Sequence, residues 1–140
     1  MSKQTYTIRE LSQKYNLPSS TLRYYEDMGL LTDVIHTEKG ARIYTQKHIE
    51  RLEGILCFKR TGLPIAKIQE YYRYETNIEE HIDAIVTMMS EQEQDILKQL
   101  ADLNSGLEHI RQKIYYYDLV KEALQNGAPM PVWDEVFPCE

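Results

Sequence analysis

The sequence predicts a mainly α-helical protein: a compact N-terminal head with one small β-hairpin, followed by a long helix that pairs with a second helix. Three observations predict this class. Apolar residues recur at helical spacing through most of residues 8–72. The spacing changes once, over residues 34–44, to strand-like alternation around a glycine-containing turn. From residue 82 onward the apolar positions follow a heptad, which is the repeat of a coiled coil.

The length and composition of the chain favour one small domain with an appendage. Its 140 residues are 42% hydrophobic and 27% charged, which suffices for one modest core and not for two full domains. We expect a head over residues 1–75, a dimerisation helix over 76–124 and a C-terminal tail over 125–140. No apolar run is long enough to cross a bilayer and the N-terminus lacks a secretory pattern, so a cytoplasmic location is expected.

Two short helices are predicted at the start of the head. Thr7 and Glu10 have the T-x-x-E form of a capping box, which predicts a helix that runs to about Tyr15. The residues Asn-Leu-Pro then break this helix, and Ser19 or Ser20 is expected to cap the next one. Two short helices joined by a tight turn form a helix-turn-helix.

The second helix of this pair has two different faces. Leu22 and Tyr25 fall on an apolar face, while Thr21, Arg23 and Tyr24 spread over the other side. In a helix-turn-helix the second helix enters the major groove of DNA, and its N-terminal amides favour phosphate. The three residues on the other side are therefore candidate DNA contacts.

A β-hairpin is predicted directly after the helix pair. Residues 34–36 and 41–44 flank a turn that contains Gly40, and alternation places Arg42 and Tyr44 on one face with Ile43 on the other. We interpret this hairpin as a wing. The head is then completed by a helix from Thr45 to Gly62 and a further helix that starts after Pro64.

The long helix carries a narrow apolar seam with Glu93 as its one defect. A helix with so narrow a seam cannot bury it alone, so a dimerising coiled coil is predicted. The residues expected to pair the two helices are Ile96, Leu100, Leu103, Leu107, Ile110, Ile114 and Tyr117. The chain after this helix carries Trp133 and Phe137, and either folds back onto the body or stays loose.

Charge is distributed unevenly along the chain. The formal net charge is -6, but residues 1–75 hold twelve Lys and Arg against nine Asp and Glu, a net +3, and residues 76–140 carry -9. The basic half can bind a polyanion although the whole chain is acidic. Neither the histidines nor the two cysteines have metal-cluster spacing, so no metal and no cofactor are expected.

The head resembles the MerR family of transcriptional regulators. The resemblance is carried by "YTIRELSQKYNLPSSTLRYYEDMGLL", "KGARIYTQKHIERLEGI" and "CFKRTGLPIAKI", and covers about residues 5–75. It implies DNA contacts by Arg23 and Tyr24 on the recognition helix, by Arg42 and Tyr44 on the wing, and by Lys59 near phosphate. His36 stands where the wing often has Arg, and belongs to the same candidate set.

The resemblance also implies partners and a mechanism. Such proteins are homodimers that bind double-stranded promoter DNA between two promoter elements spaced too far apart. The effector-bound form distorts the DNA so that both elements face RNA polymerase. Deforming a duplex of this size costs about 1–6 kcal/mol, which is within reach of a dimer that holds both half-sites.

Cys57 is a candidate sensing thiol. Lys59 and Arg60 follow it closely and favour the thiolate, whereas Glu53 one turn back opposes it. Its position resembles that of a single cysteine in a thiol-responsive branch of the family, which implies an electrophile or aldehyde as effector. The alternative is that Cys57 is an inert, small apolar residue of the core.

The sequence leaves two other classes of function to be distinguished from a regulator. An enzyme is not predicted, because the chain lacks G-x-S-x-G, H-E-x-x-H and G-x-x-x-x-G-K-[ST]. A coiled-coil protein-interaction module that does not bind an operator is the remaining alternative. Retardation of promoter DNA by the purified protein distinguishes that module from a regulator.

Overall fold

A computed structural model describes residues 4–139, which form two compact units that divide after Glu93. The structure is mainly helical, as predicted, and the long helix passes from one unit into the other. The first unit contains β1 (Thr5–Thr7), α1 (Ile8–Tyr15), α2 (Ser19–Asp27), β2 (Ile35–His36), β3 (Arg42–Thr45), α3 (Gln46–Arg60) and α4 (Ile65–Glu75). The long helix α5 (Ile78–Asn126) and α6 (Trp133–Val136) follow.

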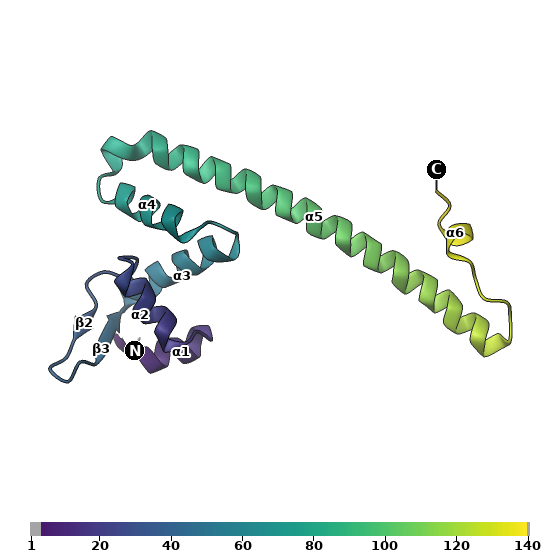
Figure 1. The fold of residues 1–140 in the computed structure, drawn as a ribbon, viewed down its shortest axis with the longest axis horizontal. Helices are drawn as coiled ribbons and strands as arrows, with labels where there is room; N and C mark the ends of the chain where they lie inside the picture. Colours follow the sequence, from purple (N-terminus) through teal and green to yellow (C-terminus); the bar gives the residue numbers. More distant parts are fainter. Residues whose placement is uncertain (1–3, 140) are drawn as a thin grey trace. The chain divides into compact units, whose positions relative to one another are not determined.

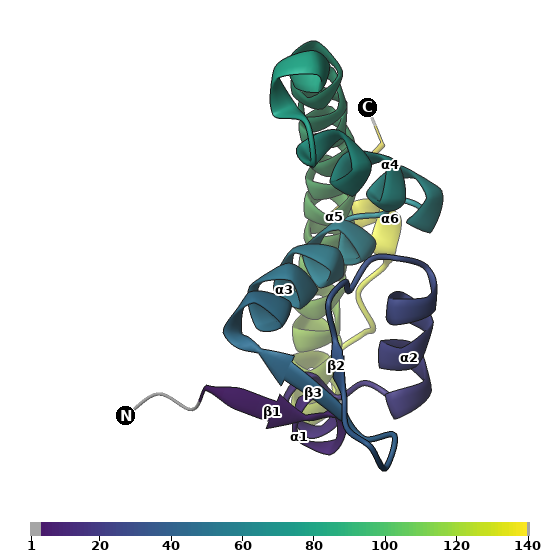
Figure 2. The same cartoon turned by 90° about the vertical axis from the view of Figure 1, so that its left-hand side faces the viewer.

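A small antiparallel sheet joins the start of the chain to the wing. Its strand order is β1-β3-β2, so the predicted hairpin of β2 and β3 gains a third strand (Figure 2). In this register Thr7 pairs with Ile43 and His36 pairs with Arg42. The strand β1 was not predicted, because three residues show no usable alternation and the strand exists only through its distant partner.

The core of the head is formed by side chains from the helices, the strand β3 and the connection after α2. Tyr25 is fully buried, as its spacing on α2 predicted. The fully or nearly fully buried set is Leu11, Leu22, Tyr25, Leu30, Leu31, Tyr44, Ile49, Leu52, Ile55, Ile68 and Tyr72. This shared core fixes α2 and the wing on one body, and so determines which of their side chains reach the surface.

The capping box of α1 is confirmed. The Glu10 N–H donates to Thr7 Oγ1 at 3.1 Å, and the Thr7 N–H donates to Glu10 Oε1 at 3.3 Å. The expected cap of α2 is wrong: Pro18 is its N-cap, and no side chain caps the helix. A proline with its fixed φ is already suited to enter a helix, so α2 begins at Ser19 without a serine cap.

A histidine completes the capping box at the start of α3. The Thr45 N–H donates to His48 Nδ1 at 2.9 Å, so Nε2 carries the proton and donates to the Thr32 carbonyl at 2.7 Å. The predicted end of α3 and start of α4 are confirmed. Gly62 has φ +95, which a glycine adopts without strain, and Pro64 is the N-cap of α4.

The helix α5 is 49 residues long and continuous, as Figure 1 shows. Its first part belongs to the head, where the buried Gln92 amide donates to the Thr61 carbonyl at 3.1 Å and to Thr61 Oγ1 at 2.8 Å. Glu93, the defect in the heptad, therefore directly follows Gln92, whose side chain binds Thr61 of the head. Beyond it the seam is exposed in the single chain, with Leu103 at 70% and Ile114 at 58%.

The C-terminal tail folds back onto the end of α5, which confirms one of the two alternatives left by the sequence. Within the second unit, the Tyr116 hydroxyl donates to the Pro131 carbonyl at 2.9 Å, and the Trp133 ring lies 5.1 Å from the Tyr116 ring. The Phe137 ring lies 6.0 Å from that of Tyr115. Among the described helices, none has the length and apolar character that a bilayer crossing requires.

Candidate nucleic-acid interface

The helix α2 presents a polar face on the surface of the head. Leu22 and Tyr25 are fully buried, and their burial turns the opposite side of the helix outward. Arg23 is exposed, Tyr24 is 46% exposed and Thr21 is half-buried. The three candidate contacts predicted on this helix therefore lie together on or near the surface.

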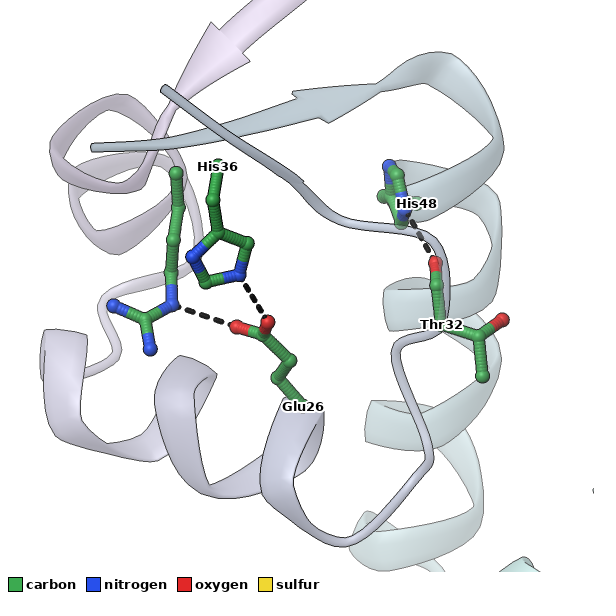
Figure 3. A network of polar contacts seen from close by, with 5 residues as sticks. Glu26, Thr32, His36 and His48 are labelled. Carbon is green, nitrogen blue, oxygen red and sulfur yellow. Dashed lines mark hydrogen bonds and ion pairs between the residues drawn. The ribbon is translucent and has the colours of Figure 1, made fainter. Parts of the chain in front are cut away.

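A carboxylate on α2 binds both strands of the wing. Glu26 Oε1 lies 2.5 Å from His36 Nε2 on β2, and Glu26 Oε2 accepts from Arg42 Nε on β3 at 2.6 Å (Figure 3). Burial acts to raise the pKa of Glu26, but the hydrogen bonds from Arg42 and His36 outweigh it and hold that pKa below its usual value. The hydrogen bond to Glu26 in turn raises the pKa of Arg42.

Sequence reasoning missed this role of Glu26. The residue belongs to the L-R-Y-Y-E motif, but an acidic residue three positions after Arg23 and next to Asp27 resembles an ordinary solvated charge. The sequence signal that could have indicated this role is the position of Glu26 in the last turn of α2, from which its side chain can reach the hairpin that follows. His36 and Arg42, both predicted as DNA contacts, thus share one partner in the free protein.

Tyr44, which was expected to contact DNA, does not reach the surface of the head in the single chain. Its side chain is fully buried, and its hydroxyl has no hydrogen-bond partner among the described residues. Arg42 and Tyr44 do share one face of β3, but that face covers the helices, so Tyr44 enters the core. Burial raises the pKa of Tyr44, and its ring packs edge-on against His48 at 5.7 Å.

The connection between α2 and the wing is fixed by two hydrogen bonds from α3. His48 Nε2 donates to the Thr32 carbonyl at 2.7 Å (Figure 3). Arg51 Nε donates to the Leu30 carbonyl at 2.7 Å. The Arg51 guanidinium also stacks over the ring of Tyr72 at 3.9 Å. Because this connection is held at its base, the wing cannot pivot freely about the end of α2.

Lys59 reaches α2 from the last turn of α3. Its Nζ donates to the Tyr25 hydroxyl at 3.2 Å while the residue itself stays exposed. The structure thus brings this predicted phosphate contact next to the recognition helix, although 34 residues separate Lys59 from Tyr25. The ammonium group is thus held against α2 by a residue of its buried face.

Cys57 lies on α3 and is exposed in the single chain, so the alternative of a buried core residue is not what the structure shows. Its carbonyl accepts from the Thr61 N–H at 3.1 Å and from Thr61 Oγ1 at 2.9 Å. Thr61 is also the residue that Gln92 of α5 binds. Within residues 4–139, no group of three His, Cys, Asp or Glu side chains is placed to hold a metal ion.

This arrangement defines a winged helix-turn-helix protein, the class that inserts its second helix into the major groove of duplex DNA. A family model described as "MerR HTH family regulatory protein" matches residues 6–75. The chain belongs to this family. The resemblance of residues 5–75 to the MerR family, which the sequence motifs indicated, is therefore confirmed. It is a DNA-binding transcriptional regulator and not an enzyme.

Known relatives match most of the chain. The crystal structure of a MerR family transcriptional regulator from Bacillus thuringiensis is 34% identical, with 79% of this chain and 97% of that chain covered and a TM-score of 0.67. The structure of HiNmlR, a MerR family regulator lacking the sensor domain and bound to promoter DNA, is 27% identical, with 89% and 96% covered and a TM-score of 0.73. An uncharacterized HTH-type transcriptional regulator of Haemophilus influenzae is 27% identical over 117 residues, which are 84% of this chain and 87% of that protein.

Proposed function

We propose that the protein is a homodimer that binds promoter DNA and responds to an effector by changing the shape of that DNA. The observation that carries the proposal is the apolar seam of α5, which is exposed in the single chain. From Leu100 to Tyr117 its members are 46% to 70% exposed. A soluble helix with such a seam is stabilised when a second helix covers it. Pairing two copies links two winged heads, which then bind two half-sites.

The proposed DNA contacts are those that the structure leaves at or near the surface of the head. Thr21, Arg23 and Tyr24 on α2 face the major groove, and Lys59, which is bound to Tyr25 of the same helix, contacts phosphate. Arg42 and His36 on the wing contact the neighbouring backbone of the DNA. Tyr44 is removed from the set because it is buried. The complete proposed set is Thr21, Arg23, Tyr24, His36, Arg42 and Lys59.

We propose that regulation acts through the length of the promoter spacer. The relative HiNmlR binds promoter DNA, which supports the same target for this chain. The wing is tied to α2 by Glu26 and at its base by His48 and Arg51, so each head moves as one body. A rotation of the heads is then passed to the DNA, at a deformation cost of about 1–6 kcal/mol. The distorted promoter presents both of its elements to RNA polymerase.

A reporter promoter with an altered spacer tests this proposal. With the native spacer, transcription should require the protein and its effector. With the spacer shortened by about two base pairs, the promoter elements already face the same side, so transcription should become independent of the protein. The measurement is transcript yield from both promoters with and without the purified protein. Equal dependence of both promoters on the protein would contradict the distortion mechanism.

We propose Cys57 as the group through which an electrophile or aldehyde acts. The thiol is exposed, and Lys59 and Arg60 follow it in sequence. In an aldehyde reaction the sulfur forms a bond to the carbonyl carbon, the C=O π bond breaks, and the thiol proton ends on the oxygen. The backbone carbonyl of Cys57 accepts from Thr61 Oγ1, which in turn accepts from the Gln92 amide of α5, so the backbone at this position is connected to α5. Atoms added at Cys57 are therefore expected to shift the junction between α3 and α5.

Replacing Cys57 with Ser or Ala should abolish the response to an aldehyde and leave promoter affinity without the aldehyde unchanged. Cys139→Ser is the matched control, since Cys139 is also free and exposed but lies in the tail. Reporter transcription and the intact mass of the treated protein are the measurements. Wild-type responses in both Cys57 variants would show that the effector acts elsewhere, and a lost response in Cys139→Ser would place the thiol in the tail.

A further inference from the structure

An acidic residue on a DNA-facing helix needs a physical reason. Glu26 lies one turn after Arg23 on α2, and its negative charge would repel the phosphates that this helix approaches. Its carboxylate is 20% exposed and bound on both oxygens, to His36 and to Arg42. The two partners come from different strands of the wing. A single carboxylate thus joins the recognition helix to both strands.

The geometry of the Arg42 contact leaves part of the guanidinium available. Glu26 Oε2 accepts from Nε, at 2.6 Å, and the two terminal nitrogens make no hydrogen bond or ion pair with the described residues. A guanidinium has five N–H donors in a fixed plane, so a bond to Nε sets the direction of the remaining four. The side chain of Arg42 is 22% exposed, which places its free edge at the surface of the wing.

We propose that Glu26 is a positioning residue that orients Arg42 for a DNA phosphate and holds the wing at a fixed angle to α2. Glu26 itself does not contact DNA. Its two oxygens are held by two strands, so the carboxylate cannot rotate without breaking one contact. The lowered pKa of Glu26 is consistent with a carboxylate that stays ionised in this environment. This inference rests on the proposed DNA contact of Arg42.

Pre-ordering of Arg42 has a measurable value. An arginine that is free in solution loses rotamer freedom when it binds, and this loss weakens the binding. If Glu26 has already restricted Arg42 in the free protein, that loss no longer accompanies DNA binding. Simple electrostatics predicts the opposite sign, because removing a negative charge near DNA strengthens binding. The direction of the change therefore separates the two explanations.

The experiment compares promoter binding by the full-length protein and four variants: Glu26→Gln, Glu26→Ala, Arg42→Ala and the double variant with Ala at both positions. Affinity is measured by fluorescence anisotropy over a range of salt concentrations. We expect Glu26→Ala to weaken binding about three- to tenfold, and Glu26→Gln to weaken it less because the amide oxygen still accepts from Arg42. With Arg42 already replaced, the loss of Glu26 should change affinity less than about twofold.

The salt dependence adds a readout that a merely structural role would not produce. Arg42→Ala should reduce the slope of log affinity against log salt by about two, since the dimer loses one phosphate contact at each of its two wings. Glu26→Ala should leave that slope unchanged, because the same phosphates are bound. Glu38→Ala is the matched control: Glu38 is an exposed acidic residue of the wing turn, and its removal should leave affinity equal or slightly higher.

Two results would overturn the proposal. One is stronger binding by Glu26→Ala, as seen for any removed negative charge. The other is an equal loss with and without Arg42, which would mean that Glu26 acts only through the stability of the head. Thermal unfolding of each variant, with the near-isosteric Glu26→Gln as the folded reference, separates lost folding from lost positioning. Wild-type binding by Arg42→Ala would also overturn the role of Glu26, whereas the proposed function fails only if the wild-type protein does not bind the promoter.

Discussion

Replacing Leu103 with Glu is expected to convert the dimer to a monomer and to weaken promoter binding about 100-fold or more. Leu103 is 70% exposed in the single chain, so its side chain contributes little to the fold of one copy. In a paired seam, however, the substitution buries two carboxylates without partners, a severe penalty for association. One head then binds one half-site, and the gain from linking two heads is lost.

Sedimentation and anisotropy measurements check this result together. Ser105→Glu is the matched control, because Ser105 is exposed on the same helix and lies outside the seam in the heptad. It adds the same charge and should leave the dimer and the affinity unchanged. The melting temperature of the head in the Leu103→Glu protein should stay close to that of the head in the wild-type protein. Both are measured at the same protein concentration. A Leu103→Glu protein that still sediments as a dimer would show that another surface pairs the two copies.

Replacing Arg23 with Ala is expected to weaken specific promoter binding by about 1–3 kcal/mol and to leave the dimer folded. Arg23 is exposed on the outward face of α2, so the loss reflects contacts with DNA and not with the core. Wild-type binding should fall steeply with added salt, since phosphate contacts release counterions. The measurement is affinity for the promoter fragment and for an unrelated duplex of equal length.

Tyr44→Phe is the control within the same domain. Its hydroxyl is buried without a partner among residues 4–139, and leaving such a group unsatisfied costs about 1–3 kcal/mol. Removing the hydroxyl should therefore keep or raise the free energy of unfolding and leave promoter affinity unchanged. Loss of affinity in Tyr44→Phe would restore Tyr44 as a DNA contact. Unchanged affinity in Arg23→Ala would remove Arg23 from the proposed set.

The sequence alone determined the helices of the head, the long helix and the family, because each depends on signals that are local in the chain. The capping box of Thr7 and Glu10, the glycine after α3 and the proline before α4 act within a few residues. The heptad of α5 is likewise a repeat along one helix. For the same reason the exposed residues of the recognition helix were predicted from the spacing of Leu22 and Tyr25.

The tertiary structure decided which side chains meet across long separations. The strand β1 exists because Thr7 pairs with Ile43, and that pairing has no signal in three residues of sequence. Alternation placed Arg42 and Tyr44 on one face of β3, but only the packing of that face against the helices buried Tyr44 and directed Arg42 to Glu26. The exposure of Cys57 depends likewise on what surrounds α3. Local spacing specifies the direction of a side chain relative to its own element, whereas its environment depends on the elements that pack against it.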